Sequence, residues 1–298
     1  MNAVAVNYIE RIDKVINYIN AHLDQSFKLE ELAKVAHFSP YHFHRIFVAV
    51  VGESVNFYTN RIRLEKAVRL LKYSSDSIQT IAYQCGFSSA STFSRSFKDY
   101  FSTSPSQFKK TGIIENSKIR KELFPMHEYL VPMSLEEKQT TYPVSIKSFP
   151  KRNIAYIRVV NSYTEGVVAN AYENLVSWTK EMGYFDNSTF FGMSLDDPMT
   201  TPKDKYRYEA CVSIPKEVSK LRHPIQQMVL PACNYATTIV RGDIQKVATG
   251  THYLFEEWLL NSEYEPLHMH GMEIFLDRNQ IHNWEHFELE LCIPVKKF

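Results

Sequence analysis

Two short segments carry hydroxyl, imidazole and guanidinium side chains at the spacing of one helix face. Duplex DNA offers phosphates that bind such groups, and base edges that side chains can reach in the major groove. The two outward sets are Tyr41, His42, His44 and Arg45 in the first segment, and Ser89, Ala90, Ser91, Thr92, Ser94, Arg95 and Lys98 in the second. Both sets alternate with phenylalanines that would face a core. The pattern predicts two DNA-reading helices in one chain.

A carboxylate is the second candidate for chemistry. Glu273 lies in the middle of an otherwise apolar segment, HGMEIFLD (270–277). A buried carboxylate needs a partner, such as a tyrosine hydroxyl, and it can attract a cationic ligand. We expect aromatic walls around it, and we keep an exposed strand carboxylate as the alternative. The candidate ligand-binding residues are Glu273, Tyr156, Tyr163, Trp178, Trp258, Phe275 and Glu290, although each aromatic residue is an equal candidate for simple core packing.

The helices that must position the first two sets can be read from apolar spacing and capping residues. Helices are expected over 8–23, 29–36, 55–73 and 78–85. Ser39 and Pro40 begin the first projecting helix, and Ser88 or Ser89 begins the second. We expect Asp76 to cap the helix at 78–85 and Gly86 to end it. No strand pattern occurs before residue 110, so residues 1–110 form an all-α domain with two helix-turn-helix units.

The second half of the chain has a different pattern. After a charged linker at 111–142, residues 143–298 follow the order strand, helix, strand, strand twice. Ala155 matches Ala236, Glu209 matches Glu290 and Cys211 matches Cys292 at a constant offset of 81. We therefore predict an α+β domain of two pseudo-symmetric βαββ repeats with a ligand crevice between them. Because Glu209 and Glu290 occur in both repeats, a structural role suits them, whereas Glu273 has Ser194 as its counterpart.

Composition excludes several classes of protein. The chain is 44% apolar and 22% charged, and it has no apolar run long enough to cross a membrane. The N-terminus lacks a signal-peptide pattern, so we expect a cytoplasmic protein. The four cysteines form no C-x-x-C pair, and no nucleotide-binding or hydrolase motif occurs, so we expect no metal and no cofactor. Residues 1–110 hold 14 Lys and Arg against 9 Asp and Glu, a basic balance that favours nucleic acid.

The first half resembles the DNA-binding domain of the AraC/XylS transcriptional regulators. The residues that carry the resemblance are RIRLEKAVRLL and SIQTIAYQCGFSSASTFSRSFKDYFSTSPSQF. The resemblance implies that Arg45 and Arg95 read base edges, with Tyr41 and His44 beside the first. Ala90 and Ser91 stand where relatives often have longer amides, which implies fewer base contacts from the second helix.

The second half, 143–298, resembles the GyrI-like effector-binding domain. NIAYIRVVNSYTE, YLFEEWLLNSEYEP, GMEIFLD and ELCIPV carry this likeness. The resemblance implies a crevice that binds small lipophilic or cationic compounds through a carboxylate and aromatic walls. Glu273 matches that carboxylate, and Met272 and Phe275 replace the flanking aromatic residues.

Together these features predict a transcriptional regulator, expected to be an activator and not an enzyme, that responds to a small molecule. The expected partners are double-stranded DNA, an effector and RNA polymerase, and the expected state is a monomer or weak homodimer. Two alternatives stay open. One is a GyrI-like hydrolase with Glu273 as base and Trp178 or a tyrosine polarising a carbonyl. The other is a module that sequesters a protein partner and has vestigial DNA contacts.

Overall fold

The computed structural model describes residues 3–112, 114, 126–196, 201–215, 217–218, 221–267, 269–282 and 284–297. The chain divides into two compact units, Met1–Lys121 and Glu122–Phe298. The first unit is helical and the second is rich in strands, as the sequence predicts. No helix in the described ranges is both long and apolar enough to span a membrane.

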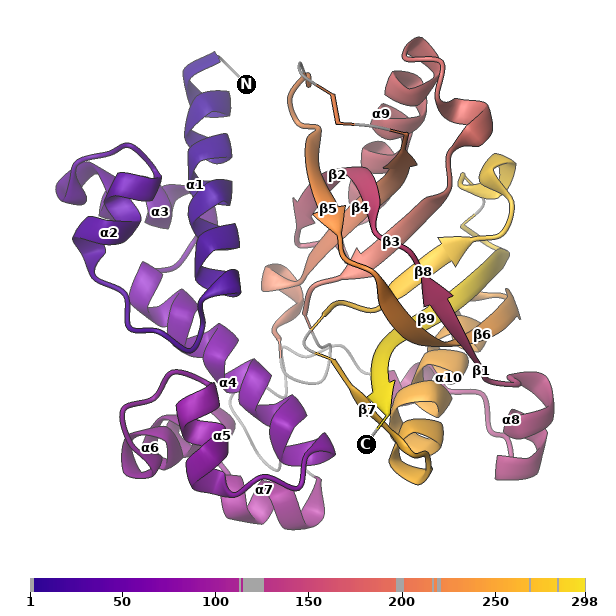
Figure 1. Cartoon of the computed structure of the whole chain (residues 1–298), viewed down its shortest axis with the longest axis horizontal. Coiled ribbons are helices and arrows are strands. Elements are labelled where there is room, and N and C mark those ends of the chain that lie inside the picture. The colour runs from indigo at the N-terminus through magenta and orange to yellow at the C-terminus, as the bar shows by residue number, and fades with distance from the viewer. Residues whose placement is uncertain are drawn as a thin grey trace. The chain divides into compact units, whose positions relative to one another are not determined.

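Seven helices in the described part of the first unit build its fold (Figure 1). They are α1 (Ala3–Ala21), α2 (Leu29–Val35), α3 (Pro40–Val51), α4 (Val55–Tyr73), α5 (Ile78–Gln84), α6 (Ala90–Phe101) and α7 (Pro105–Thr111). Two apolar clusters hold them together. One joins α1 to α3 with the start of α4, and the other joins the rest of α4 to α5, α6 and α7. Helix α4 therefore belongs to both helix-turn-helix cores.

Serine side chains begin the helices after the turns. Ser39, Ser54, Ser89 and Ser104 accept hydrogen bonds from backbone amides at the starts of α3, α4, α6 and α7. The N-cap of α5 is Ser77, so the prediction of Asp76 is wrong. Ser77 accepts from the amide of Thr80 at 3.0 Å. Asp76 lies one residue too early to reach that amide, and its carboxylate instead accepts from the amide group of Gln84 at 3.1 Å.

Glycine is required at the turn after α5. Gly86 has a φ of 76°, and a Cβ there would lie 2.2 Å from the carbonyl oxygen of Leu23. The left-handed conformation and the close approach both favour a residue without a side chain. The Cys-Gly-Phe break thus sets the angle between α5 and α6.

The second unit is built on one antiparallel sheet (Figure 1). Its strands are β1 (Ser145–Phe149), β2 (Arg152–Val160), β3 (Phe190–Ser194), β4 (Arg207–Ile214), β5 (Gln226–Leu230), β6 (Cys233–Gly242), β7 (Tyr264–Pro266), β8 (Met272–Phe275) and β9 (Phe287–Lys297). The strand order is β1-β6-β9-β8-β3-β4-β2-β5, and β7 pairs with β9. Helix α9 (Val167–Glu181) contacts β2 and β4, and α10 (Ile244–His252) contacts β6 and β9.

Several elements of this unit differ from the sequence-based prediction. The edge strands β1 and β5 and the short β7 were not predicted, since they are only three to five residues long. The helix expected in the second predicted repeat is α10 followed by a π-helical turn at Tyr253–Trp258. The range predicted as a linker contains the helix α8 (Leu135–Thr141), which Ser134 and Glu137 begin with a capping box.

Candidate functional sites

Helix α3 exposes one polar face and buries the other. Phe43 and Phe47 are fully buried, whereas His42, His44 and Arg45 are exposed. The ring of His42 lies 3.2 Å from the hydroxyl of Ser39, which places it at the helix start. The backbone of Tyr41 lies in the first turn of α3, and its side chain is outside the described part. The exposed groups can donate to phosphates and, through Arg45, to base edges.

Helix α6 has the same division of faces. Phe93 and Phe97 are fully buried, and Ser91, Arg95 and Lys98 are exposed. Two of the predicted contact residues have a structural task. Ser89 accepts a hydrogen bond from the backbone amide of Thr92 at 3.1 Å, and the two hydroxyls lie 3.0 Å apart. Arg95 and Lys98 are therefore the exposed side chains of α6 that are long enough to contact DNA.

In the second unit, a straight row of residues crosses six strands on one face of the sheet. The strand register gives the row as Thr238, Leu291, Glu273, Gly192, Ala210 and Ile157. Both helices cover this face, since Gly250 of α10 packs near Leu291 and Tyr172 of α9 lies near Gly192. Glu273 thus lies in the middle of the sheet, on the side of the two helices.

Tyrosine hydroxyls surround the carboxylate. Tyr208 of β4 donates a hydrogen bond to Oε2 of Glu273 at 3.2 Å, and the hydroxyl of Tyr172 lies 3.1 Å from that of Tyr208. Gly192 makes this arrangement possible, because a Cβ there would lie 1.5 Å from the Tyr208 oxygen. The expectation that a tyrosine would partner Glu273 is met by Tyr208, which the sequence did not single out.

Burial changes the acidity of these groups. Desolvation raises the pKa of Glu273, and the hydrogen bond from Tyr208 opposes part of that rise. Desolvation also raises the pKa of both Tyr172 and Tyr208 well above the ordinary tyrosine value. The tyrosines therefore stay neutral donors at neutral pH, and the group that can change charge is Glu273.

Aromatic rings extend the site beyond the tyrosines. Phe275 packs edge-on against Tyr172, with ring centroids 5.3 Å apart. The ring centroid of Trp284 lies 6.2 Å from that of Tyr172, and Trp284 is 41% exposed. An exposed indole packed near Tyr172, on the sheet face that carries the half-buried Glu273, can cover an apolar or cationic ligand. Sequence reasoning missed Trp284, because it lies in a loop where no strand or helix period marks it.

Two predicted residues lie on the opposite face of the sheet. Tyr156 neighbours Ile157 of the Glu273 row along β2, so its side chain points the other way, into the core cluster. Its hydroxyl donates to Gln226 at 2.8 Å. Glu290 pairs with Lys147 at 2.5 Å, and Glu209 pairs with Arg158 at 2.9 Å. The structure thus gives both repeated glutamates an ion pair on the face away from Glu273.

The remaining predicted aromatic residues make ring contacts elsewhere. Tyr163 packs on Tyr206 at 4.9 Å, and Trp258 stacks on Tyr264 at 6.1 Å. Trp178 is nearly buried and meets Tyr184 edge-on at 6.2 Å. Of the predicted ligand-binding set, the structure brings together Glu273 and Phe275.

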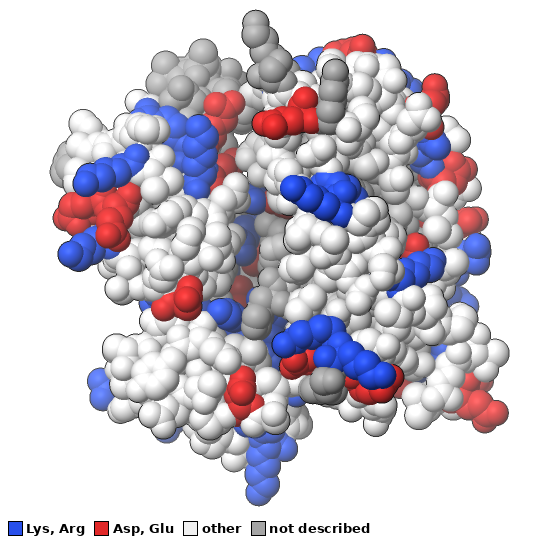
Figure 2. All heavy atoms as spheres, in the orientation of Figure 1, with Lys and Arg blue, Asp and Glu red and all other residues white. Residues whose placement is uncertain are grey.

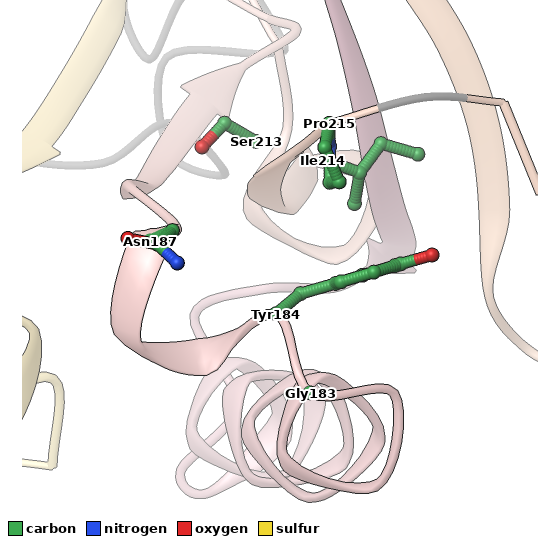
Figure 3. A pocket seen from close by; sticks show the side chains of 6 residues that line it. All are labelled: Gly183, Tyr184, Asn187, Ser213, Ile214 and Pro215. Atoms are coloured by element: carbon green, nitrogen blue, oxygen red, sulfur yellow. The ribbon is translucent and has the colours of Figure 1, made fainter.

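A separate pocket of about 360 Å³ lies at the turn after α9 (Figure 3). Its lining residues are Gly183, Tyr184, Asn187, Ser213, Ile214 and Pro215. Figure 3 shows the Tyr184 side chain extending beneath Ile214 and Pro215. The hydroxyl of Ser213 is engaged by the backbone amide of Thr189 at 2.7 Å. This pocket contains none of the residues around Glu273.

Charge on the visible surface is mixed. Figure 2 shows Lys and Arg interspersed with Asp and Glu over the displayed face of the second unit. In the described ranges, no group of three or more His, Cys, Asp or Glu could hold a metal ion. All four cysteines are free thiols. The Glu273 carboxylate, with its hydrogen bond from Tyr208, is one feature that could select a ligand by charge.

Comparison with protein families assigns both halves. A family model for the GyrI-like small molecule binding domain matches residues 142–296, which is more than half of the chain. The chain belongs to the GyrI-like family. A second model, for a helix-turn-helix domain of the AraC type, matches residues 32–111. The protein therefore joins an AraC-type helix-turn-helix domain to a GyrI-like domain.

Curated relatives share part of the chain. Regulatory protein PocR of Salmonella typhimurium is 36% identical over 107 residues, which are 36% of this chain and 35% of the relative. The HTH-type transcriptional regulator Rv1931c of Mycobacterium tuberculosis is 43% identical over 83 residues, which are 28% of this chain and 32% of the relative. The chain thus spans about a third of the length of these relatives.

Solved structures resemble each half. The DNA-binding domain of AdpA, solved with a target DNA, is 28% identical, with a TM-score of 0.33, over 33% of this chain and 89% of that chain. The EcmrR C-terminal domain is 16% identical, with a TM-score of 0.40, over 53% of this chain and 99% of that chain.

Proposed function

We propose that this protein is a sequence-specific DNA-binding transcriptional regulator that responds to a small molecule. The observation that carries the proposal is the union, in one chain, of an AraC-type helix-turn-helix domain and a GyrI-like small molecule binding domain. We assign residues 1–110 to DNA binding, 111–142 to the connection and 143–298 to the effector. The two compact units, which divide after Lys121, support this organisation.

DNA recognition is assigned to α3 and α6. The exposed guanidinium groups of Arg45 and Arg95 suit bidentate contacts with guanine, and Lys98 suits a phosphate. Two such helices in one chain can read successive segments of the major groove about one turn, roughly 34 Å, apart. A single chain would then cover what other regulators cover by dimerising, so we expect a monomer or weak homodimer.

The effector is assigned to the sheet face at Glu273, which α9 and α10 cover. We expect a cationic or lipophilic compound, because the site offers one carboxylate together with tyrosine, phenylalanine and tryptophan rings. Tyr208 satisfies the carboxylate in the structure described here. A ligand cation would take over that role and gain from the aromatic faces.

We also propose that the effector domain consists of two related βαββ repeats. Read from its two ends, the sheet has corresponding strands in the same order: β1, β6, β9 and β8 from one end match β5, β2, β4 and β3 from the other. The pairing of Ala155 with Val212 recurs 81 residues later as the pairing of Ala236 with Ile293. By this register the counterpart of Glu273 is Gly192, not Ser194 as the sequence alignment suggested. Only one of the two equivalent positions carries a carboxylate.

For a ligand to affect DNA binding, its presence must change the connecting segment at 111–142, and α10 contacts that segment. The amide of Val131 donates to Thr249 at 2.8 Å, Tyr142 donates to the carbonyl of Lys246 at 3.3 Å, and Lys138 pairs with Glu257. Glu257 lies in the π-helical turn that follows α10. Turns of this kind are unusual and often occur at functional sites. Residues before β1 are thereby held against the helix that borders the effector site.

The proposal is tested by selecting genomic fragments that bind the full chain and measuring affinity with and without candidate cations. We expect discrete sites, bound with an affinity that a cationic compound changes, and transcription from adjacent promoters that rises through contact with RNA polymerase. DNA binding without sequence preference would contradict the regulatory proposal. Sequence-specific binding that no compound alters would contradict the effector part alone.

A further inference from the structure

The sheet face opposite Glu273 holds a guanidinium group. Arg152 begins β2, is half-buried, and extends over the core cluster of that face. Its central carbon lies 5.0 Å from the ring centroid of Phe149 and 5.0 Å from that of Phe191. One terminal nitrogen lies 2.8 Å from the sulfur of Met272. The group is thus held between two aromatic rings and a thioether.

Arg152 is half-buried, and it differs from three arginines whose side chains are almost fully buried and paired with carboxylates. Arg61 pairs with Glu53 at 2.7 Å, Arg158 with Glu209 at 2.9 Å, and Arg207 with Asp196 at 2.9 Å. Within the described ranges, no carboxylate forms an ion pair with Arg152. Charges that lose part of their hydration are ordinarily paired, because the desolvation is otherwise uncompensated.

The polar neighbours of Arg152 do not neutralise it. The thiols of Cys211 and Cys292 and the hydroxyl of Tyr235 lie close enough to interact with it electrostatically. Burial raises the pKa of both thiols and raises that of Tyr235 to about 12, so all three are neutral at neutral pH. The guanidinium therefore keeps its charge, and, among the described residues, its hydrogen bond goes to Met272, so that further N–H donors can serve a ligand.

We propose that Arg152 anchors a second ligand site, which takes the carboxylate of a small acid with an apolar body. A guanidinium edge matches a carboxylate in a bidentate geometry. The residues at the rim of this cluster, Phe149, Met228 and Cys233, are partly exposed and apolar, and they would cover the body of the acid. A strongly hydrated inorganic anion would leave those surfaces uncovered, so the site favours the organic acid.

The site is separate from the one at Glu273. Met272 and Glu273 are neighbours on β8 and point to opposite faces, so the two sites share strands but no side chain. The inference does not depend on the proposed function. Glu273→Gln should leave binding at Arg152 unchanged, and failure of either assignment can be recognised without the other.

The test uses cyclohexanecarboxylate and its neutral analogue cyclohexanecarboxamide on the full chain, with calorimetry at fixed ionic strength. We expect the acid to bind at least tenfold more tightly than the amide. Arg152→Met should abolish this preference, and Arg152→Lys should keep only part of it. Arg222→Met is the matched control, since it removes an exposed guanidinium that pairs with Glu181, and it should change nothing. Equal binding of acid and amide would overturn the proposal, as would phosphate binding without binding of the acid.

A readout on the unaltered protein guards against variants that fail to fold. With ¹³C-labelled methionine methyl groups, the acid should shift the signals of Met272 and Met228, which border the site. The signal of Met182, exposed after α9, should stay in place. Uniform shifts, or none up to millimolar acid, would exclude a site at Arg152.

Discussion

Glu273 lies directly opposite Gly192 in the pairing of β3 with β8. Because Gly192 has no side chain, the Tyr208 side chain can pass over it and reach Glu273. The Tyr208 ring crosses above Gly192, and its hydroxyl donates to the carboxylate at 3.2 Å. This hydrogen bond offsets part of the cost of desolvating the half-buried carboxylate. The glycine, the tyrosine and the glutamate therefore form one unit.

Gly192→Ala should break that unit. The added Cβ would lie 1.5 Å from the oxygen and 2.2 Å from Cζ of Tyr208, so the ring must move away from Glu273. We expect a loss of about 1–3 kcal/mol in the free energy of unfolding, as is usual for overpacked cores. Urea unfolding measures it. In a Tyr208→Leu background, which lacks the clashing ring, Gly192→Ala should cost much less, and a Gly192→Ala variant as stable as the parent would contradict the geometry.

Glu273→Gln should show how much of the ligand affinity at the proposed effector site comes from charge and how much from shape. The amide keeps the size and hydrogen bonding of the carboxyl group but removes its charge. For a matched cationic and neutral ligand, we expect the cation to lose roughly 10–100-fold in affinity, which corresponds to a charged contact of about 1.5–3 kcal/mol. The neutral ligand should lose little, and DNA affinity without ligand should stay unchanged. Calorimetry measures both. Glu290→Gln, at an ion pair on the other face, is the control, and a larger loss there would reject Glu273 as the charged group.

The pH dependence follows from the raised pKa of Glu273. A cation binds the ionised carboxylate, so its affinity should fall as pH is lowered through that raised pKa. Tyr208→Phe removes the hydrogen bond that lowers this pKa. The fall in affinity should therefore begin at a higher pH in the variant. Titrations at a series of pH values measure the midpoint, and a midpoint moved to lower pH would contradict the assigned role of Tyr208.

The same shift affects stability. The pKa of Glu273 is higher in the folded chain than in the unfolded chain, so its contribution to stability is complete below the unfolded value. That contribution is lost as pH rises through the folded value. Glu273→Gln cannot ionise, so it should gain stability relative to the parent protein as pH rises through this range.

The sequence predicted the elements whose residues repeat with a clear period. The phenylalanines of α3 and α6 mark the buried faces, so the exposed faces with Arg45 and Arg95 follow directly. The sequence predicts serine caps for α3 and α6, and the structure confirms them, whereas it predicts Asp76 for α5, where Ser77 is the cap, because both residue types can cap a helix. A helix face is predicted from several residues at regular spacing, whereas a cap is predicted from a single residue and is therefore easier to misplace.

The surroundings of Glu273, the proposed effector site, were predicted only in part, for a physical reason. Glu273 is visible in sequence because a charge interrupts an apolar strand. Its donor Tyr208 lies 65 positions away along the chain, and Tyr172, whose hydroxyl contacts that of Tyr208, lies 101 positions away. Both come near Glu273 only through the strand order and the packing of α9. Tyr156 is a candidate for the aromatic lining of the ligand site by residue type alone, because aromatic character does not tell which face of a strand a residue occupies. Register decides that, and register is a property of the folded sheet.

Coupling between ligand and DNA should depend on Lys138. Its ammonium group pairs with Glu257 of the π-helical turn, with side-chain exposures of 16% and 23%. Lys138→Met should reduce the effect of ligand on DNA affinity, while each affinity measured alone changes little. Lys296→Met, which removes the more exposed pair with Glu265, is the control and should leave the effect intact. If both variants respond to ligand like the parent protein, α10 does not carry the signal.

The two DNA-reading helices should contribute unequally. Arg45 of α3 is exposed and long enough for two hydrogen bonds to one guanine, so Arg45→Ala should cost about 1–3 kcal/mol at the cognate site and relax specificity at one base pair. Ser91 of α6 carries a short hydroxyl, and Ser91→Ala should cost less. Lys98→Ala should weaken all sequences alike and lower the salt slope by about one, as expected for a single phosphate contact. Gel shifts over a range of salt concentrations and operator variants measure these effects. If Ser91→Ala proves costlier than Arg45→Ala, α6 rather than α3 reads the bases most closely.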